Sequence, residues 1–182
     1  AIPVVSGIKS ESERFAGAQN TYTLEAMMQD GKALQMCTSH VLNHSFSQAF
    51  GIKFQDENGE TKSPYCSSWG LTTRVIGAMV MVHGDDKGLI IPPKIAPISA
   101  VIIPIYKNET EKEAVLNMAS KIKDSIYKER IEIIIDDDEQ ATPGAKFFHW
   151  ELKGIPVRIE IGPKDIENNQ VVFVNRAENE KN

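Results

Sequence analysis

Long apolar runs and cysteine are both scarce in this sequence of 182 residues. No stretch of about 18 apolar residues occurs, so the sequence predicts no membrane-spanning helix, and no basic-then-apolar signal peptide opens it. The two cysteines, Cys37 and Cys66, form neither a CxxC pair nor a disulfide framework. A chain with so few cysteines fits a reducing, cytoplasmic compartment best.

Positively charged residues are also fewer than negatively charged ones. Residues 1–96 carry 8 Lys and Arg against 9 Asp and Glu, and residues 97–182 carry 12 against 16. Neither part has the basic stripe typical of proteins that bind nucleic acid without sequence preference, and we expect no DNA partner. An RNA partner would have to be recognised through local hydrogen bonds and stacking. A P-loop or other glycine-rich nucleotide fingerprint is absent as well.

The first part of the sequence favours strands. Thr21–Met28 alternates apolar and polar side chains, as a strand does, and Lys32–Met36 is its expected return strand after a turn at Asp30-Gly31. The stretch Ser39–Phe50 has apolar residues at helical spacing and a serine that can cap it, with a glycine directly after it. It therefore predicts a helix.

A second group of elements follows before the middle of the chain. Strands are expected at Ile52–Gln55 and Tyr65–Thr73, around a turn at Asn58-Gly59. Arg74–His83 is almost wholly apolar after its first residue and predicts a buried helix that ends at the next glycine. The proline-rich stretch 91–97 is expected to be a linker.

The second part has a different order of elements. The expected order is strand, helix, strand, followed by helix, strand and strand. This order favours a small α/β domain with a mixed sheet. A proline at the first turn and a glycine at the end bound its second helix. The expected elements are Ala100–Ile105, Glu109–Tyr127, Ile131–Ile135, a helix from Pro143 to Gly154, Ile155–Ile161 and Gln170–Asn175.

Arg74 lies where a polar strand passes into an apolar helix, directly after Thr72 and Thr73. A guanidinium at such a place can present its planar, permanently charged fork to phosphate oxygens. Position alone favours the alternative, a surface arginine in an ion pair.

The sequence around Arg74 resembles a known family. Residues 68–74 (SWGLTTR) and 76–89 (IGAMVMVHGDDKGL) resemble motif 3 of class II aminoacyl-tRNA synthetases, in the form that prolyl-tRNA synthetases use. Residues 15–35 (FAGAQNTYTLEAMMQDGKALQ) with TSH at 38–40, and 92–107 (PPKIAPISAVIIPIYK), are similar to the same family, as are 143–165 (PGAKFFHWELKGIPVRIEIGPKD). Four ordered blocks cover nearly the whole chain.

The resemblance implies roles for individual residues. Arg74 would bind the ATP phosphates and stabilise charge as pyrophosphate leaves, while Gln35 and Thr72 would contact the adenosine part. The expected proline and adenylate pocket is formed by Phe15, Thr38, His40, Trp69 and Gly70. The implied reaction is carboxylate attack on the α-phosphate and then acyl transfer to tRNA(Pro), a step of protein biosynthesis that needs positioning and charge stabilisation but no protein nucleophile.

Metal sites are weakly indicated. His40 and His44 would lie four apart on the predicted helix, a spacing that can bind a metal, but no third ligand is near. Asp85 and Asp86 could bind Mg²⁺ beside ATP, although such a pair more often caps a turn. We therefore expect Mg²⁺ to arrive with ATP and predict no metal ligand in this chain.

The implied anticodon-binding domain contains a run of four acids at 136–139. A solvated loop is the default for such a run, yet carboxylates can also accept hydrogen bonds from guanine, and a proline anticodon carries two guanines. Phe147 or Phe148 could stack on a base, but core packing is the alternative for both and is favoured for at least one. The candidate RNA contacts are Asp137, Lys146, Glu151, Arg158 and Glu160.

The family pattern also indicates what this chain does not contain. Motif 1, the dimer element, is not found, nor is motif 2, which supplies a second arginine to the α-phosphate. We therefore expect a piece of a longer, homodimeric enzyme. Residues 1–96 would be the C-terminal half of its class II catalytic domain, and residues 97–182 its anticodon-binding domain. Such a chain should lack ligase activity by itself. The alternative is a non-catalytic, tRNA-binding or regulatory paralogue.

Three departures from the family pattern concern the pocket. Met36 and Cys37 stand where the family usually has small residues, and Asn43 stands where it usually has glycine.

Overall fold

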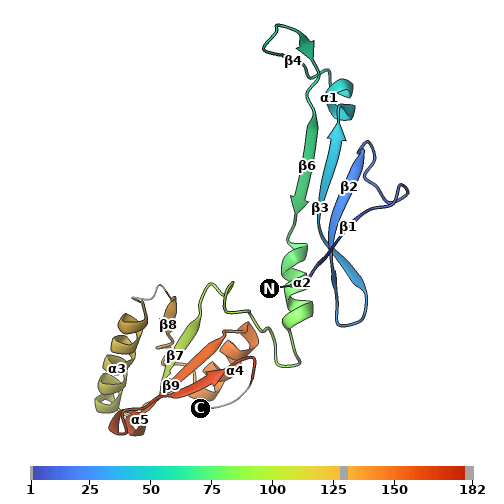
Figure 1. The fold of residues 1–182 in the computed structure, drawn as a ribbon. Helices are drawn as coiled ribbons and strands as arrows, with labels where there is room; N and C mark the ends of the chain where they lie inside the picture. Colours follow the sequence, from blue (N-terminus) through green and yellow to red (C-terminus); the bar gives the residue numbers. More distant parts are fainter. Residues whose placement is uncertain (1, 128–130, 179–182) are drawn as a thin grey trace. The chain divides into compact units, whose positions relative to one another are not determined.

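The structure is a computed structural model that describes residues 2–127 and 131–178. It divides into two compact units, an N-terminal unit of residues 2–82 and a C-terminal unit from residue 83 onward (Figure 1). The predicted domain boundary between residues 96 and 97, which follows from the family resemblance, stays a prediction.

The N-terminal unit is built on an antiparallel sheet of four strands in the order β1-β2-β3-β6. This confirms the antiparallel sheet expected for the first part. Strand β3 is longer than predicted, and it is paired with β2 along one edge and with β6 along the other. The four strands are β1 Val5–Ile8, β2 Asn20–Met27, β3 Ala33–Asn43 and β6 Cys66–Leu71.

The helix predicted over Ser39–Phe50 is wrong in its first half. β3 continues to Asn43, and only Ser45–Ala49 form a helix, α1, which ends before Gly51. The apolar spacing is compatible with a helix, but residues 39–41 pair with strands on both sides, and those hydrogen bonds outweigh the local pattern.

Asn43 ends β3 in a left-handed backbone conformation, with φ at 53°. Glycine adopts this conformation without strain, and asparagine tolerates it better than most residues. The departure from the family's glycine is therefore explained by the backbone. The Oδ1 atom of Asn43 is buried and has no hydrogen-bond partner among the described residues.

A small hairpin lies at the end of β3 and β6 that is opposite α2 (Figure 1). Its strands, β4 Phe54–Gln55 and β5 Thr61–Lys62, flank the predicted turn at Asn58-Gly59. The second strand expected there, at residues 65–73, instead belongs to the large sheet as β6. Asp56 closes the turn, since its carboxylate accepts from the backbone N–H groups of residues 58 and 60.

Helix α2, Arg74–His83, has the predicted bounds, but it is less buried than predicted. Its Ala78 packs with Ala26, Met28 and Met36 of the sheet, and this cluster is the core of the N-terminal unit. Three other apolar side chains of the helix are exposed: Ile76, Val80 and Met81.

The C-terminal unit is the predicted α/β domain with a mixed sheet. The strand order is β10-β9-β7-β8, in which β7 runs parallel to β8 and β9, and β10 runs antiparallel to β9. Its elements are β7 Ala100–Pro104, α3 Glu109–Tyr127, β8 Ile133–Ile135, α4 Pro143–Lys153, β9 Val157–Ile161, α5 Pro163–Glu167 and β10 Val172–Asn175. Only the short α5 was not predicted.

Helices α3 and α4 cover opposite faces of this sheet (Figure 1). Successive residues of β7 point to the two faces, so Ile102 packs with Val115 of α3, while Val101 and Ile103 pack with Phe147 and Trp150 of α4. The sheet is thus buried on both sides, as its almost continuous apolar strands indicate.

Helix α4 is bounded by local capping chemistry. The hydroxyl of Thr142 accepts from the N–H of Ala145, and Pro143 occupies the first turn. Gly154 ends the helix with φ at 73°, and a Cβ there would come within 2.3 Å of the carbonyl oxygen of Leu89. The segment before β7 therefore packs directly on the end of α4, where Ile91 donates to the carbonyl of Gly154.

No helix in the described part of the chain is long and apolar enough to span a membrane.

We predict that Asn43→Val lowers the free energy of unfolding of the N-terminal unit by about 1–2 kcal/mol, because a β-branched side chain is strained at positive φ. Asn43→Gly should change it by less than about 1 kcal/mol, because glycine suits the backbone and removes an unpaired polar atom. Urea denaturation followed by circular dichroism measures both. Asn20→Val, the same replacement at a regular β2 position, is the control; an equal loss there would contradict the backbone explanation.

Candidate functional site

His40 lies at the centre of a polar cluster on one face of the N-terminal sheet. Its Nδ1 is 3.0 Å from the hydroxyl of Thr21, its pairing partner on β2. Its Nε2 is 3.1 Å from the hydroxyl of Thr38, two residues earlier on β3. The ring of Phe15 covers the imidazole, with 4.6 Å between centroids. The structure thus brings together three of the residues predicted to form the pocket, namely Phe15, Thr38 and His40.

The loop that carries Phe15 is held on the sheet by its backbone. The N–H of Phe15 donates to the hydroxyl of Thr21 at 3.1 Å, and Ala18 donates back to the carbonyl of Phe15. Gly17 has φ at 84°, and a Cβ at this position would lie 3.1 Å from the ring of Phe46. The ring of Phe15 is therefore positioned by contacts within the fold.

A β-bulge at Met36 lets Gln35 share the face of Thr38 and His40. Gln35 is paired with Glu25, whereas the next pair along the ladder is Cys37 with Leu24, so Met36 is an extra residue in β3. In a regular strand, residues 35 and 38 would point to opposite faces. The bulge places all three side chains on one face. Gln35, Thr38 and His40 pair with odd-numbered residues of β2, which share one face of the sheet because side chains alternate along a strand.

Arg74 lies next to Gln35, another of the predicted ATP contacts. Its guanidinium donates to the carbonyl of Gln35 at 3.3 Å, and its N–H donates to the hydroxyl of Thr72. The side chain of Gln35 accepts from Lys9 at 2.6 Å, a contact that the sequence did not indicate. Among the described residues no carboxylate pairs with Arg74, so the surface ion pair considered for it is not observed.

Trp69 and Gly70 lie on different faces of the sheet. Gly70 is paired with Thr38 and so belongs to the polar face, but Trp69 is paired with Ser39 and points to the other side. Its side chain is 74% exposed. There it lines an open hollow of about 750 Å³ together with Ile8, Tyr22, Leu24 and Leu71. Thr38 and Gly70 also line this hollow. Trp69 therefore shares a hollow with two residues of its predicted pocket, although its side chain and that of His40 point to opposite faces of the sheet.

His40 and His44 do not share a helix, because His40 is in β3 and His44 precedes α1. The expectation that the two histidines lie on one helix is therefore wrong. His44 contacts the carbonyl of Pro64 and stacks on Tyr65 with 4.0 Å between centroids. Within residues 2–127 and 131–178, no group of three or more His, Cys, Asp and Glu side chains could hold a metal ion.

The acidic run of the C-terminal unit begins with a residue that has a structural role. Asp136 accepts from the indole N–H of Trp150 at 2.6 Å and pairs with the ammonium of Lys146 at 3.2 Å. Burial would raise the pKa of Asp136, but the hydrogen bonds from Trp150 and Lys146 outweigh it, and the pKa lies below its usual value. Lys146, only 5% exposed, also donates to the backbone carbonyl of Asp136 and so holds the loop on α4.

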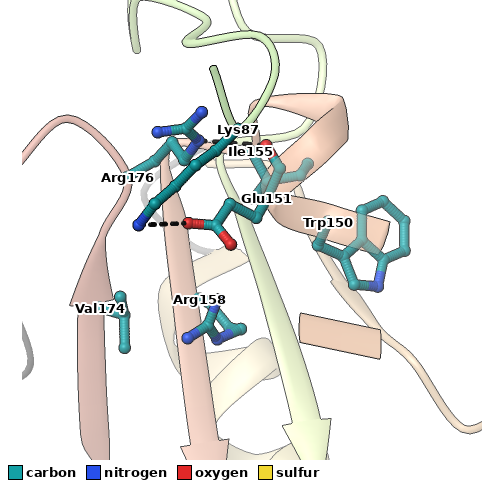
Figure 2. A pocket seen from close by; sticks show the side chains of 7 residues that line it. All are labelled: Lys87, Trp150, Glu151, Ile155, Arg158, Val174 and Arg176. Atoms are coloured by element: carbon teal, nitrogen blue, oxygen red, sulfur yellow. Dashed lines mark hydrogen bonds and ion pairs between the residues drawn. The ribbon is translucent and has the colours of Figure 1, made fainter. Parts of the chain in front are cut away.

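The other predicted RNA contacts lie in two different places. Asp137 is exposed and lines a groove of about 460 Å³ between the acidic loop and α4, together with His149 and Lys153. Glu151 and Arg158 line a smaller hollow of about 170 Å³, shown in Figure 2. Phe148 is 73% exposed on α4, whereas Phe147 packs in the core, which agrees with the expectation that one of the two would do so.

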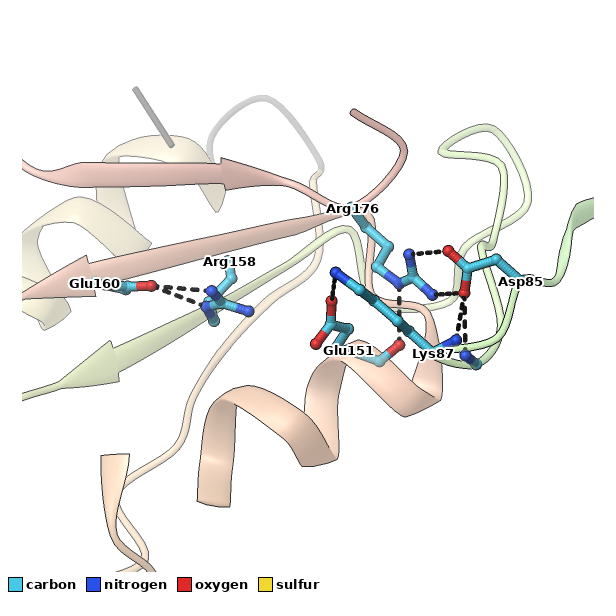
Figure 3. A network of polar contacts seen from close by, with 7 residues as sticks. Asp85, Lys87, Glu151, Arg158, Glu160 and Arg176 are labelled. Atoms are coloured by element: carbon cyan, nitrogen blue, oxygen red, sulfur yellow. Dashed lines mark hydrogen bonds and ion pairs between the residues drawn. The ribbon is translucent and has the colours of Figure 1, made fainter. Parts of the chain in front are cut away.

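The charged residues around the smaller hollow are already paired (Figure 3). Lys87 lies 3.5 Å from the carboxylate of Glu151. Arg158 pairs with Glu160 at 3.0 Å and lies over the ring of Phe147. A ligand that needs these charges would first have to replace an existing partner.

Asp85 and Arg176 form a bidentate ion pair. Two guanidinium nitrogens of Arg176 contact the two carboxylate oxygens of Asp85 at 2.6 and 2.9 Å, and Arg176 is only 5% exposed. Asp85 also accepts from the N–H groups of Lys87 and Gly88. It therefore caps a turn, which is the interpretation that the sequence favoured over Mg²⁺ binding. These hydrogen bonds, that from Arg176 above all, hold the pKa of Asp85 well below its usual range.

Comparison with protein families gives two matches that together cover most of the chain. Residues 2–83 match the class II core domain of tRNA synthetases for G, H, P, S and T, and residues 99–182 match an anticodon-binding domain.

Curated relatives are similar over nearly the whole chain. A chloroplastic/mitochondrial proline–tRNA ligase of Arabidopsis thaliana is 54% identical over 97% of the chain and 32% of its own length. A proline–tRNA ligase of Alkaliphilus oremlandii is 53% identical over 100% of the chain and 37% of its own length. One from Roseiflexus is 48% identical over 97% and 36%. The chain thus spans about a third of the length of these relatives.

The low pKa of Asp85 predicts how the C-terminal unit responds to acid. A carboxyl group whose pKa is depressed by folding stabilises the fold above its unfolded pKa of about 4, and this contribution is lost as the pH falls towards the folded value. Asp85→Asn should therefore lower the melting temperature at pH 7, and the difference from wild type should narrow below about pH 4.

Trp150 fluorescence in a Trp69→Phe background reports the C-terminal unit alone, because the chain has two tryptophans. Asp86→Asn makes the same charge change at the neighbouring exposed position and is the matched control. A melting difference for Asp85→Asn that stays constant between pH 7 and about pH 2 would show that the ion pair is not its cause.

Proposed function

The chain belongs to the prolyl-tRNA synthetase family of class II aminoacyl-tRNA synthetases, and from this we propose that the whole protein ligates proline to tRNA(Pro) with ATP, through a prolyl-adenylate. One observation carries the proposal. A single sheet face holds Gln35, Thr38 and His40, with Phe15 over the histidine and Arg74 against Gln35.

The proposed first step joins proline to AMP. A proline carboxylate oxygen attacks the α-phosphate of ATP, the bond to the bridging oxygen breaks, and pyrophosphate leaves. Arg74 is suited to stabilise the charge on the phosphates, because its guanidinium has donors that the carbonyl of Gln35 does not use. Thr72 and Gln35 would contact the adenosine part, and Phe15, Thr38, His40 and Gly70 would line the proline side. Trp69, which lines a hollow with Thr38 and Gly70, would form the floor of the pocket together with Gly70.

The second step transfers the prolyl group to a hydroxyl of the terminal ribose of tRNA(Pro), and AMP leaves. Neither step needs a protein nucleophile, since the enzyme contributes position and a fixed electrostatic environment. The family in general uses ATP with Mg²⁺. The described residues contain no suitable acidic cluster, so we assign no residue of this chain to the metal.

The remaining parts of the proposal follow from the family. The whole protein would be a homodimer in the cytoplasm, where free Cys37 and Cys66 stay reduced. Its macromolecular partner would be tRNA(Pro) and not DNA. This chain spans about a third of its relatives, and its sequence has no motif 2 to grip the α-phosphate. The chain alone is therefore expected not to catalyse proline-dependent exchange between ATP and pyrophosphate at an enzyme's rate.

A chimera tests the catalytic proposal. In the Alkaliphilus oremlandii protein, the aligned 181 residues are replaced by this chain, and charging of tRNA(Pro) with proline is measured. We expect activity, and we expect Arg74→Ala to lower kcat by about 10²–10³-fold, the loss typical when a group that stabilises developing charge is removed. Arg74→Lys should recover only part of it, because lysine keeps the charge but lacks the planar fork.

Lys53→Ala, which removes an exposed positive charge from the same unit, is the control and should leave kcat unchanged. A chimera that folds and binds tRNA(Pro) but does not charge it would favour the non-catalytic paralogue. Equal rates for the Arg74→Ala chimera and its parent would remove Arg74 from the site.

The anticodon proposal is tested on the chain itself. Asp137 is the one predicted contact that is both exposed and without a cation at hydrogen-bonding distance among the described residues, so it can accept from a guanine edge. We expect Asp137→Asn to weaken binding of tRNA(Pro) by about tenfold. Fluorescence anisotropy at one fixed salt concentration measures this, because phosphate contacts vary with salt.

Asp124→Asn, on the exposed side of α3, makes the same charge change on the opposite face of the sheet and is the matched control. A transcript whose two anticodon guanines are replaced by adenines should bind wild type and Asp137→Asn equally. If Asp137→Asn still distinguishes the two transcripts as strongly as wild type does, Asp137 does not read a guanine.

A further inference from the structure

We propose that Thr21 is a positioning residue, whose hydroxyl holds His40 in the tautomer with hydrogen on Nε2 and thereby leaves the hydroxyl hydrogen of Thr38 to donate to a ligand. That the ligand is proline or its adenylate rests on the proposed function. The tautomer itself does not, because it follows from the contacts of the free chain.

Thr21 is among the most buried side chains of the N-terminal unit, at 1% exposure. It lies on β2 directly opposite His40 on β3. Its hydroxyl oxygen is 3.1 Å from the N–H of Phe15 and 3.0 Å from Nδ1 of His40. No third contact of this oxygen occurs in the described part of the chain. A polar atom so deeply buried has to satisfy its hydrogen bonds with these two neighbours.

The direction of the hydrogen bond between Thr21 and His40 follows from counting donors. A threonine hydroxyl has one hydrogen to donate and two lone pairs to accept with. The N–H of Phe15 can only donate, so it occupies one lone pair. If His40 donated from Nδ1, it would occupy the other lone pair, and the hydroxyl hydrogen would be buried with no acceptor. If Thr21 donates to Nδ1, every group is satisfied, so this arrangement is favoured.

The tautomer then decides what happens on the other side of the ring. Since Nδ1 accepts, the hydrogen of neutral His40 is on Nε2. Nε2 therefore donates to the hydroxyl oxygen of Thr38, 3.1 Å away. Thr38 accepts from the histidine, and its own hydrogen remains available. The backbone N–H of Phe15 thus sets the direction of the hydrogen bonds through Thr21 and His40 to Thr38. As a result, the Thr38 hydroxyl can donate to an acceptor oxygen of the ligand.

The neighbouring contacts keep this chain of hydrogen bonds in place. Phe15 supplies the first N–H and also covers the imidazole with its ring. One short loop therefore both sets the direction of the hydrogen bonds and shields the histidine from water on that side. Thr38 is only partly buried, as a group that meets a ligand must be.

Nitrogen-15 NMR of the chain tests the proposal without any ligand. Two-bond correlations between the ring hydrogens and nitrogens of histidine distinguish the two tautomers, and a His40→Gln variant identifies the signals of His40 among the four histidines. The spectra are recorded at about pH 8, where a free imidazole is neutral. We expect only the Nε2–H form in wild type. A His40 that carries its hydrogen on Nδ1 in wild type would overturn the proposal, whatever any variant does.

Variants then show whether Thr21 is the cause. Thr21→Ser keeps the hydroxyl and should keep the tautomer. Thr21→Val has nearly the same shape but no hydroxyl, and a measurable Nδ1–H population should appear. Thr23→Val, at the next buried threonine of β2, is the control and should leave His40 unchanged. An unaltered tautomer in folded Thr21→Val, or the same change in Thr23→Val, would contradict a positioning role.

The same variants in the chimera connect the tautomer to the reaction. Thr21→Val should lower kcat/KM for proline about tenfold, the scale of one lost hydrogen bond to a ligand, and Thr21→Ser should restore it. Wild-type kcat/KM in Thr21→Val would overturn the link to ligand binding. A chimera that never charges tRNA contradicts the proposed function, while the NMR result still decides the role of Thr21.

Discussion

Strand β3 is hydrogen-bonded on both sides, and the geometry of the N-terminal unit depends on this double pairing. Because side chains alternate along a paired strand, Thr38 and His40 are forced onto one face and Trp69 of β6 onto the other. The same pairing places Thr21 opposite His40 and buries it. A helix through these residues would have turned His40 towards His44 and separated the hydroxyl groups from the imidazole.

Elements with their own end signals could be predicted from the sequence. Helix α4 begins at Pro143 and ends before Gly154 as expected, because capping is a local property of a few residues. The helix predicted over Ser39–Phe50 was wrong where strand pairing with distant residues replaced it. Ser39 pairs with Tyr22 and Trp69, which are 17 and 30 residues away in the sequence. The spacing of apolar residues contains no information about such distant partners. The exposure of α2 was not predicted for the same reason, because an apolar sequence does not indicate which other part of the protein covers the helix.

The candidate site was predictable as a set of residues but not as an arrangement. The family resemblance named Gln35, Thr38 and His40, and the sheet brings them together. It did not name Thr21, whose importance appears only when the register is known. In the C-terminal unit, Lys146 was named as an RNA contact although it is committed to Asp136 inside the fold. Such pairings join residues distant in sequence, so composition and spacing contain no sign of them.

The bulge at Met36 also limits how this part of the chain can evolve. Between Gln35 and Thr38 this chain has Met36 and Cys37 in place of the family's small residues, and Met36 packs in the core of the unit. The number of residues between Gln35 and Thr38 determines the face on which Gln35 lies. Deleting one residue would return β3 to regular alternation and turn Gln35 away from His40, although every residue with a proposed role would still be present. The length of this segment therefore decides which face carries Gln35, whatever residues the segment contains.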